Sequence, residues 1–422
     1  MYNAIYRLNP YTYNGYQHCC RECKDMEALR IHVIWAKRAG QAKNLAVDVA
    51  SEPPKSADFA ERISRHFDGI GMERDGVAHR VPVRFWSEPW IDGTAVPRSI
   101  DLANARFNII ILLYDGSMAA PALKPHWENY IENLHAEIER RGNVDLYMAF
   151  GDPAGATPLK PDFDRKIQYA RRDKWKTTIA PTSLETHLLL HIVFKIRVHL
   201  NTLLGTEGEE DLFVSHAKLD GDSTASSIVD YVNSRDNDVP LRTFYDAKAL
   251  SPGDHFADEF AKAIQSGTLL AIVSDAYDSR PWCIYELTEA KRARRPIVLA
   301  DIGKVRISRT YPYGANLPRV RVNPVIGEFS WIEPLLVECL SEGLRCDLFN
   351  LEVATQLGEA KDGVMILPRP PELFDIIDCE TTPETVVYPD PPLSRLESDL
   401  IWKALRIRGG ETASLKTLSD IQ

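Results

Sequence analysis

The sequence predicts an α/β protein with two parallel-sheet domains and a small αβ extension at the C-terminal end. Short apolar runs recur along the chain, and segments with helical periodicity separate them. This alternation is typical of βαβ units, in which a helix connects two parallel strands. It occurs on both sides of the acidic segment 205–210, and 422 residues are enough for two or three domains.

The first predicted domain occupies residues 31–182. Its most apolar run, RFNIIILLY, has the composition of a strand that is buried on both faces of a sheet. Phe59, Ile63 and Phe67 recur at helical spacing and indicate the buried face of a helix. The strands are expected at 31–36, 81–86, 106–114 and 144–150, and the helices at 57–67 and 127–141.

The second half repeats the alternation more clearly. A helix predicted at 184–204 leads into the linker GTEGEE. Phe256, Phe260 and Ile264 then form the apolar stripe of a further helix. The strands are expected at 211–217, 241–247, 268–277 and 295–302, and the helices at 223–234, 254–265, 281–294 and 331–344.

Apolar runs at 363–368 and 385–389 and a helical segment at 393–405 predict an αβ extension that is too small to form an independent domain. The expected organisation is an N-terminal segment at 1–30, a first α/β domain at 31–182, a helix and linker at 183–210, a second α/β domain at 211–345 and the extension at 346–422.

The composition favours an ordinary globular protein, with 44% hydrophobic and 26% charged residues. The net charge of −10 disfavours a direct nucleic-acid partner, because duplex binding is driven by a basic surface. The sequence shows no signal peptide, and the most apolar helix carries Glu185, Lys195 and Arg197, so no membrane span is expected. Seven cysteines without an export signal indicate reduced thiols and a cytoplasmic protein.

The second half resembles the TIR (Toll/interleukin-1 receptor) domain family over about 210–345. The motifs DLFVSHA, FYDAKALSPGD, LLAIVSDAY and SRPWCIYEL occur in the family's order and spacing. The resemblance implies a flavodoxin-like domain, a parallel sheet with helices on both faces. In many bacterial, plant and some animal members it also implies cleavage of the nicotinamide–ribose bond of NAD, with NAD as the substrate and no cofactor or metal.

Glu286 is the expected catalytic residue. Loss of nicotinamide leaves an oxocarbenium-like ribose, which a nearby carboxylate would stabilise. Trp282 lies four residues earlier on the predicted helix and therefore on the same face. In the family, such a Trp-x-x-x-Glu pair and an aromatic residue on the second strand form the NAD site, and Phe244 stands at the strand position. A helix glutamate taken alone is more often a solvated side chain, and a tryptophan taken alone is more often part of the core.

Four further residues are expected to bind the substrate. Ser215 and His216 end the first strand at the edge of the sheet where ligands of α/β folds bind. Many catalytic members carry an arginine just after this point, whereas this chain has Lys218, which could supply the charge without the planar fork. Asp246 is as well placed to anchor the following loop as to contact the substrate.

The loop that contains Leu250, Pro252 and Gly253 matches the family's BB loop, through which TIR domains stack. Pro-Gly favours a turn, and Leu250 would be an exposed apolar tip. We therefore expect self-assembly of TIR domains through this loop, and in several family members the active site is completed between two protomers.

The first half shows a similar order of elements and is interpreted as a degenerate TIR-like domain with a regulatory role. Trp127 is followed by Glu132, one position beyond the spacing of the Trp282–Glu286 pair. An unrelated α/β domain is the alternative. The segment that holds His18, Cys19, Cys20 and Cys23 could bind zinc, but no second ligand pair is placed to complete a site.

The function expected from the sequence is a cytoplasmic NAD glycohydrolase that releases nicotinamide and ADP-ribose, or a cyclic variant. Bacterial proteins of this kind are commonly antiphage defence effectors, which assembly activates, so an activating protein or second messenger is an expected partner. The alternatives are a non-enzymatic TIR adaptor and a nucleoside-processing enzyme of similar fold.

Overall fold

The computed structural model divides the chain into two compact units. The N-terminal unit comprises Gly15–Gly71 and Arg80–Glu185, and the C-terminal unit comprises Met1–Asn14, Met72–His79 and Thr186–Gln422. The described residues are 27–36, 55–68, 70–74, 77–87, 96–114, 116–142, 144–151, 184–205, 211–244, 264, 267–304, 316–325, 327–357 and 362–421.

The N-terminal unit contains a four-stranded parallel sheet with the order β4-β1-β5-β6. Numbered along the chain, its strands therefore follow the order 2-1-3-4, which is how a flavodoxin-like sheet begins. The four strands predicted in the first half are confirmed. They are β1 (Glu27–Trp35), β4 (Val83–Trp86), β5 (Ala105–Leu113) and β6 (Leu146–Phe150).

Two helices accompany this sheet, α2 (Lys55–Asp68) and α3 (Lys124–Arg140), as the apolar spacing predicts. Trp127 on α3 is 2% exposed and packs in one apolar cluster with Ile110 and Leu112 of β5. The tryptophan is thus a core residue of this unit. Between α2 and β4 the chain forms a small two-stranded sheet from β2 (Gly71–Arg74) and β3 (Val77–Arg80).

A buried polar chain crosses the same sheet. The indole of Trp86 donates to His32, and the His32 ring is 3.0 Å from the side-chain oxygen of Asn108. The Asn108 amide donates to Asp145, which Arg141 also binds at 2.5 Å. Burial lowers the pKa of His32 to about 4, and the hydrogen bond to Asn108 offsets this only in part. The ring is therefore neutral in the folded protein at pH 7.

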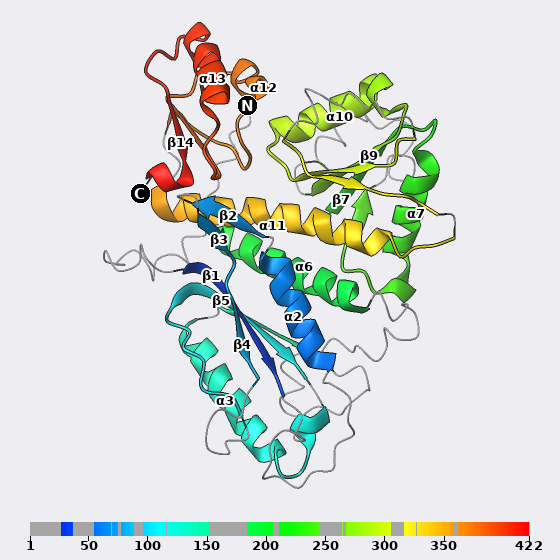
Figure 1. The fold of residues 1–422 in the computed structure, drawn as a ribbon, viewed down its shortest axis with the longest axis vertical. Coiled ribbons are helices and arrows are strands. Elements are labelled where there is room, and N and C mark those ends of the chain that lie inside the picture. Colours follow the sequence, from blue (N-terminus) through cyan, green and yellow to red (C-terminus); the bar gives the residue numbers. More distant parts are fainter. Residues whose placement is uncertain are drawn as a thin grey trace. The chain divides into compact units, whose positions relative to one another are not determined.

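The main sheet of the C-terminal unit is parallel throughout and has the order β11-β10-β9-β7-β8. Along the chain this is 2-1-3-4-5, the strand order of flavodoxin-like folds, so the expected fold class is confirmed. Figure 1 shows these strands in green and yellow. They are β7 (Asp211–His216), β8 (Arg242–Phe244), β9 (Thr268–Val273), β10 (Ile297–Asp301) and β11 (Arg319–Arg321).

Among the described residues, the helices that precede the C-terminal extension in this unit are α6 (Leu184–Leu204), α7 (Asp222–Asn233), α10 (Pro281–Arg292) and α11 (Ile332–Leu357). The prediction that the last of them ends at Leu344 is wrong, because α11 runs on to Leu357 and passes through residue 345, where the sequence placed a domain boundary. Of the helix expected at 254–265, all but Ile264 lies outside the described residues.

Helix α6 is packed against α11 within this unit, although the sequence assigned it to a connecting segment. Arg197 is 2% exposed and donates to Asp347 at 2.8 Å. A Cβ atom at Gly343 would lie 2.1 Å from the Arg197 guanidinium, so glycine at that position leaves room for the buried guanidinium. Among the residues that the structure describes, no helix is both long and apolar enough to cross a membrane.

The C-terminal extension forms a three-stranded parallel sheet, β12-β13-β14, next to the end of α11 (Figure 1). Phe349 and Val353 of α11 pack with Val387 and Leu418 of the extension. Its elements are β12 (Val364–Ile366), α12 (Leu373–Ile377), β13 (Thr385–Tyr388), α13 (Arg395–Ile407) and β14 (Ser414–Thr417).

Candidate active site

The candidate site lies at the carboxyl edge of the second sheet. β7 and β9 are neighbours there, and the chain continues from β9 into α10. Strand β8 lies on the other side of β7, so the direction of strand succession reverses between β7 and β9. Ligands of open α/β sheets bind at this point of reversal.

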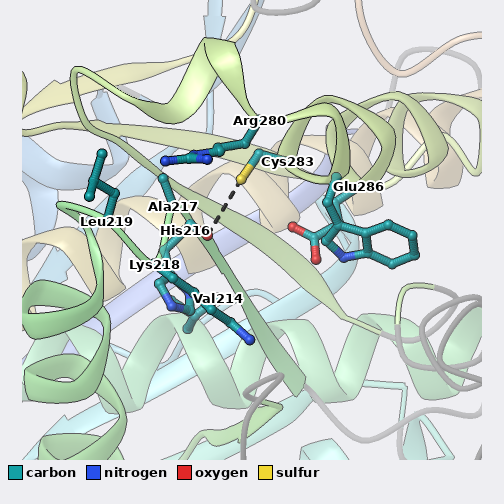
Figure 2. A pocket seen from close by; sticks show the side chains of 9 residues that line it. Val214, His216, Ala217, Lys218, Leu219, Arg280, Cys283 and Glu286 are labelled. Carbon is teal, nitrogen blue, oxygen red and sulfur yellow. Dashed lines mark hydrogen bonds between the residues drawn. The ribbon is translucent and has the colours of Figure 1, made fainter.

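A cavity of about 730 Å³ opens at this position. Its volume is in the range of small-molecule and cofactor sites, about 300–1,000 Å³. One wall comes from the end of β7 and the loop after it, and the other comes from the start of α10 (Figure 2). The lining residues are Val214, His216, Ala217, Lys218, Leu219, Arg280, Trp282, Cys283 and Glu286.

Glu286 lines this cavity and is 3% exposed. The Ser215 hydroxyl donates to its Oε2 at 2.5 Å. Ser215 has then used its only proton, so the Tyr277 hydroxyl, 2.9 Å away, donates to Ser215 in turn. Burial and the Glu286 charge raise the pKa of Tyr277 far above its usual value, which keeps this donor protonated. The three side chains thus form a directed hydrogen-bond chain that ends on the carboxylate.

Trp282 presents a large apolar surface one turn before Glu286. It is 40% exposed, unusually open for a tryptophan, and lines the same cavity. Its ring packs at 5.0 Å from that of Tyr285 with an interplanar angle of 33°. Pro281 at the first helical position starts α10 and places the tryptophan at the mouth of the cavity.

Two cationic side chains, Lys218 and Arg280, line the cavity from opposite walls (Figure 2). Lys218 was expected from the sequence, whereas Arg280 was not. Arg280 could have been found from its position directly before Pro281, where a side chain lies beside the positive end of a helix. The site therefore offers a guanidinium as well as an ammonium group to an anionic ligand.

The loops that form the walls are fastened to each other. Asp220 accepts from the Ser274 hydroxyl at 2.5 Å and from the backbone N–H of Ala276 at 2.9 Å. The Cys283 thiol donates to the backbone carbonyl of His216 at 3.4 Å, which links the start of α10 to the end of β7 (Figure 2). His216 itself is 7% exposed, with its Nε2 3.4 Å from Asp222.

The structure brings together Glu286, Trp282, Ser215, His216 and Lys218 as the sequence proposed. Phe244 is the last residue of β8, next to β7, but its side chain lies outside the described part of the chain. The remaining predicted residues, Asp246, Leu250, Pro252 and Gly253, also lie outside the described residues.

The N-terminal unit does not reproduce this arrangement. Trp127 is buried in its core, and Glu132 is an exposed side chain of α3. Trp127 and Glu132 therefore do not face a common cavity as Trp282 and Glu286 do.

The family model of the TIR domain matches residues 212–321, so the C-terminal half contains a TIR domain. No curated protein matches the chain. Among solved structures, the chain is similar to the crystal structure of tagatose-6-phosphate ketose/aldose isomerase from Escherichia coli, with 10% identity over 81% of this chain and 86% of the other. The TM-score of 0.20 is too low for this likeness to support an argument.

Proposed function

We propose that this TIR-domain protein is an NAD glycohydrolase. The observation that carries the proposal is the Glu286 carboxylate, which lines a ligand-sized cavity at the edge of the sheet and is held there by Ser215. In the reaction, the bond between ribose C1′ and the nicotinamide nitrogen breaks, and nicotinamide leaves as a neutral molecule with the electron pair. Water then adds to C1′ and loses a proton, which gives ADP-ribose.

In this reaction Glu286 is the catalytic residue. Its negative charge stabilises the positive charge that develops on the ribose, and its second oxygen, Oε1, can accept a hydrogen bond from a ribose hydroxyl. Only 3% of the residue is exposed, so little water screens the carboxylate. Ser215 is a positioning residue, because its hydroxyl binds the carboxylate and fixes the direction of the other oxygen.

The other lining residues suit the remaining parts of NAD. Trp282 offers an apolar ring face to the nicotinamide, which is a flat cationic ring before cleavage. Lys218 and Arg280 can bind the diphosphate, and Arg280 also lies at the N-terminal end of α10. No metal is needed to activate the leaving group, because nicotinamide is a cationic pyridinium while it is bound to the ribose and leaves as a neutral molecule.

The proposal includes activation by self-association. TIR domains associate with one another, and the resemblance assigns this contact to the loop with Leu250, which lies outside the described residues. The N-terminal unit would then control the assembly in response to a protein partner or a second messenger. NAD depletion on infection is the corresponding cellular role, in the cytoplasm of a bacterial host.

The substrate is tested by incubating the purified full chain with NAD and, separately, with nucleosides. The reaction is followed at several protein concentrations with and without a crowding agent. We expect nicotinamide and ADP-ribose, or its cyclic form, in equal amounts from NAD and no base release from nucleosides. Base release from nucleosides alone would instead identify a nucleoside-processing enzyme.

A TIR adaptor without catalysis is the second candidate function. It is favoured by the burial of Glu286 and its hydrogen bond to Ser215, because a carboxylate that only stabilises the sheet edge would look the same. Light scattering and NAD turnover of Glu286→Gln separate the two functions. An enzyme loses turnover but still assembles, whereas a protein that assembles and never releases nicotinamide from NAD is an adaptor.

A further inference from the structure

A second group of polar side chains lies outside the cavity, where α6 meets the segment before β8. His187 and His191 are four residues apart on α6, and their Nε2 atoms are 3.1 Å from each other. Asp238 follows the short helix at Arg235–Asn237, and its Oδ2 is 3.9 Å from Nε2 of His191. One ligand atom from each of the three residues lies within 4.8 Å of the others.

These distances suit a tetrahedral metal ion. Zinc–nitrogen bonds of about 2.0–2.1 Å at a tetrahedral angle place two ligand nitrogens about 3.3 Å apart. The two imidazoles are already at nearly this separation. The Asp238 oxygen lies farther away, 3.9 Å from Nε2 of His191, on a side chain that is 66% exposed and would move towards a bound ion.

A carboxylate orients His187 from behind. Its Nδ1 is 2.7 Å from Oε1 of Glu333, which also accepts from the Tyr231 hydroxyl at 2.7 Å. Oε1 of Glu333 is an acceptor for Tyr231 and for Nδ1–H of His187, so Nε2 of His187 carries a lone pair. That lone pair accepts a hydrogen bond from Nε2–H of His191, and a metal ion would take the place of this proton. Histidines that bind metals are commonly held in this way.

The charges around the cluster also favour a cation. Glu333 is 2% exposed, and its second oxygen is buried without a hydrogen-bond partner among the residues that the structure describes. A buried carboxylate is costly unless positive charge lies nearby.

We propose that His187, His191 and Asp238 bind a divalent transition metal, of which Zn²⁺ is the best match, with Glu333 and Tyr231 as the second layer. The fourth position is open to water at the Asp238 side. The site shares no residue with the cavity around Glu286 and does not depend on the proposed NAD cleavage. It connects α6 to the segment that leads into β8. No metal was expected from the sequence, because the reaction that the TIR resemblance implies requires none.

The site is tested on the full chain by titrating metal-free protein with Co²⁺ and reading the visible absorption, which is intense for tetrahedral cobalt. A Zn²⁺ competition titration and the metal content of the purified protein complete the measurement. We expect one Co²⁺ ion to bind per chain and Zn²⁺ to displace it. Glu333→Gln should weaken binding about 10–100-fold, as is usual for second-layer changes, and His191→Gln and Asp238→Asn should weaken it at least as much.

The matched control is His199→Gln, which changes another histidine of α6 two turns further on and should leave Co²⁺ binding unchanged. Asp238→Asn alters an exposed side chain and keeps the test valid should His191→Gln fail to fold. A variant with Cys19, Cys20 and Cys23 changed to serine tests whether the N-terminal thiolates bind the metal instead. The proposal is overturned by folded protein that binds no Co²⁺, by binding that the serine variant loses, or by equal affinities in Asp238→Asn and wild type.

Discussion

At the scale of single residues, the hydrogen-bond chain Tyr277–Ser215–Glu286 decides how the carboxylate is presented. Tyr277 is fully buried and Ser215 is 1% exposed, so both positions are fixed by the core. Their pattern in the sequence is unremarkable, because a serine at a strand end and a tyrosine after a strand are common. Their link to a glutamate 71 residues later appears only in the folded structure.

Ser215→Ala tests this positioning role. The variant removes a hydrogen bond to a charged group, worth about 1.5–3 kcal/mol, so we expect kcat for NAD cleavage to fall about 10–100-fold. KM should change little, because the hydroxyl is directed at Glu286 and not at the cavity. Steady-state kinetics check this, with Ser227→Ala on α7 as a control hydroxyl that bonds only its own helix. A rise in KM at constant kcat would contradict the assignment.

His32 gives a pH prediction for the N-terminal unit. Its pKa is about 4 in the folded protein and 6.5 unfolded, so the unfolded chain binds the extra proton between these values. The contribution of His32 to the free energy of unfolding is up to about 3 kcal/mol. It is complete above pH 6.5 and is lost as the pH falls towards 4. Urea unfolding at pH 7 and pH 4.5, compared with His32→Gln, measures the effect. A wild-type pH dependence equal to that of the variant would contradict it.

At the scale of elements, the contact between α6 and α11 depends on a glycine. Gly343→Ala would place a methyl group 2.1 Å from the Arg197 guanidinium and displace it from Asp347. Overpacking and the weakened buried ion pair should lower the free energy of unfolding by about 2–4 kcal/mol. Chemical denaturation checks this, with Thr355→Ala on the same helix expected to change stability by less than about 1 kcal/mol. A Gly343→Ala variant as stable as Thr355→Ala would show that the Arg197 guanidinium can move aside without loss of stability.

Helix α10, which carries Trp282 and Glu286, is tied to the extension by a buried ion pair. Lys291 Nζ is 2.7 Å from Glu372, and the lysine side chain is 1% exposed. Lys291→Met and Glu372→Leu should each cost about 3–5 kcal/mol, because each leaves a buried charge without its partner. The double variant should cost much less than the sum. A double-mutant cycle by thermal or chemical unfolding tests this, and additive losses would argue against the coupling.

The elements also show what local pattern can and cannot predict. The helix around 184–204 was predicted with its bounds, because apolar residues recur along its whole length despite Lys195 and Arg197. The end of α11 was not, since Arg345 and Asp347 interrupt the apolar run, and Asp347 is satisfied by Arg197, 150 residues away. Strand β14 is too polar and helix α12 is too short to show a period. Arg280 was missed for a related reason, because only the folded structure places it at the same cavity as Lys218.

At the scale of the whole molecule, the account links activity to assembly. If TIR domains stack through the loop with Leu250, NAD turnover per protomer should rise with protein concentration. Leu250→Glu places a charge at the apolar tip, so we expect turnover at least about tenfold lower at the same concentration. Light scattering should show fewer assemblies, and circular dichroism should be unchanged. Turnover per protomer that is independent of concentration would contradict activation by assembly.

Nicotinamide release from NAD by Glu286→Gln, measured under conditions in which the wild type assembles, tests whether Glu286 is the catalytic residue. Glu289→Gln is the matched control, because it makes the same change one turn later, outside the cavity. We expect the rate to fall at least about a thousandfold in Glu286→Gln and to stay close to wild type in Glu289→Gln. Nicotinamide release by Glu286→Gln at the wild-type rate would contradict the account.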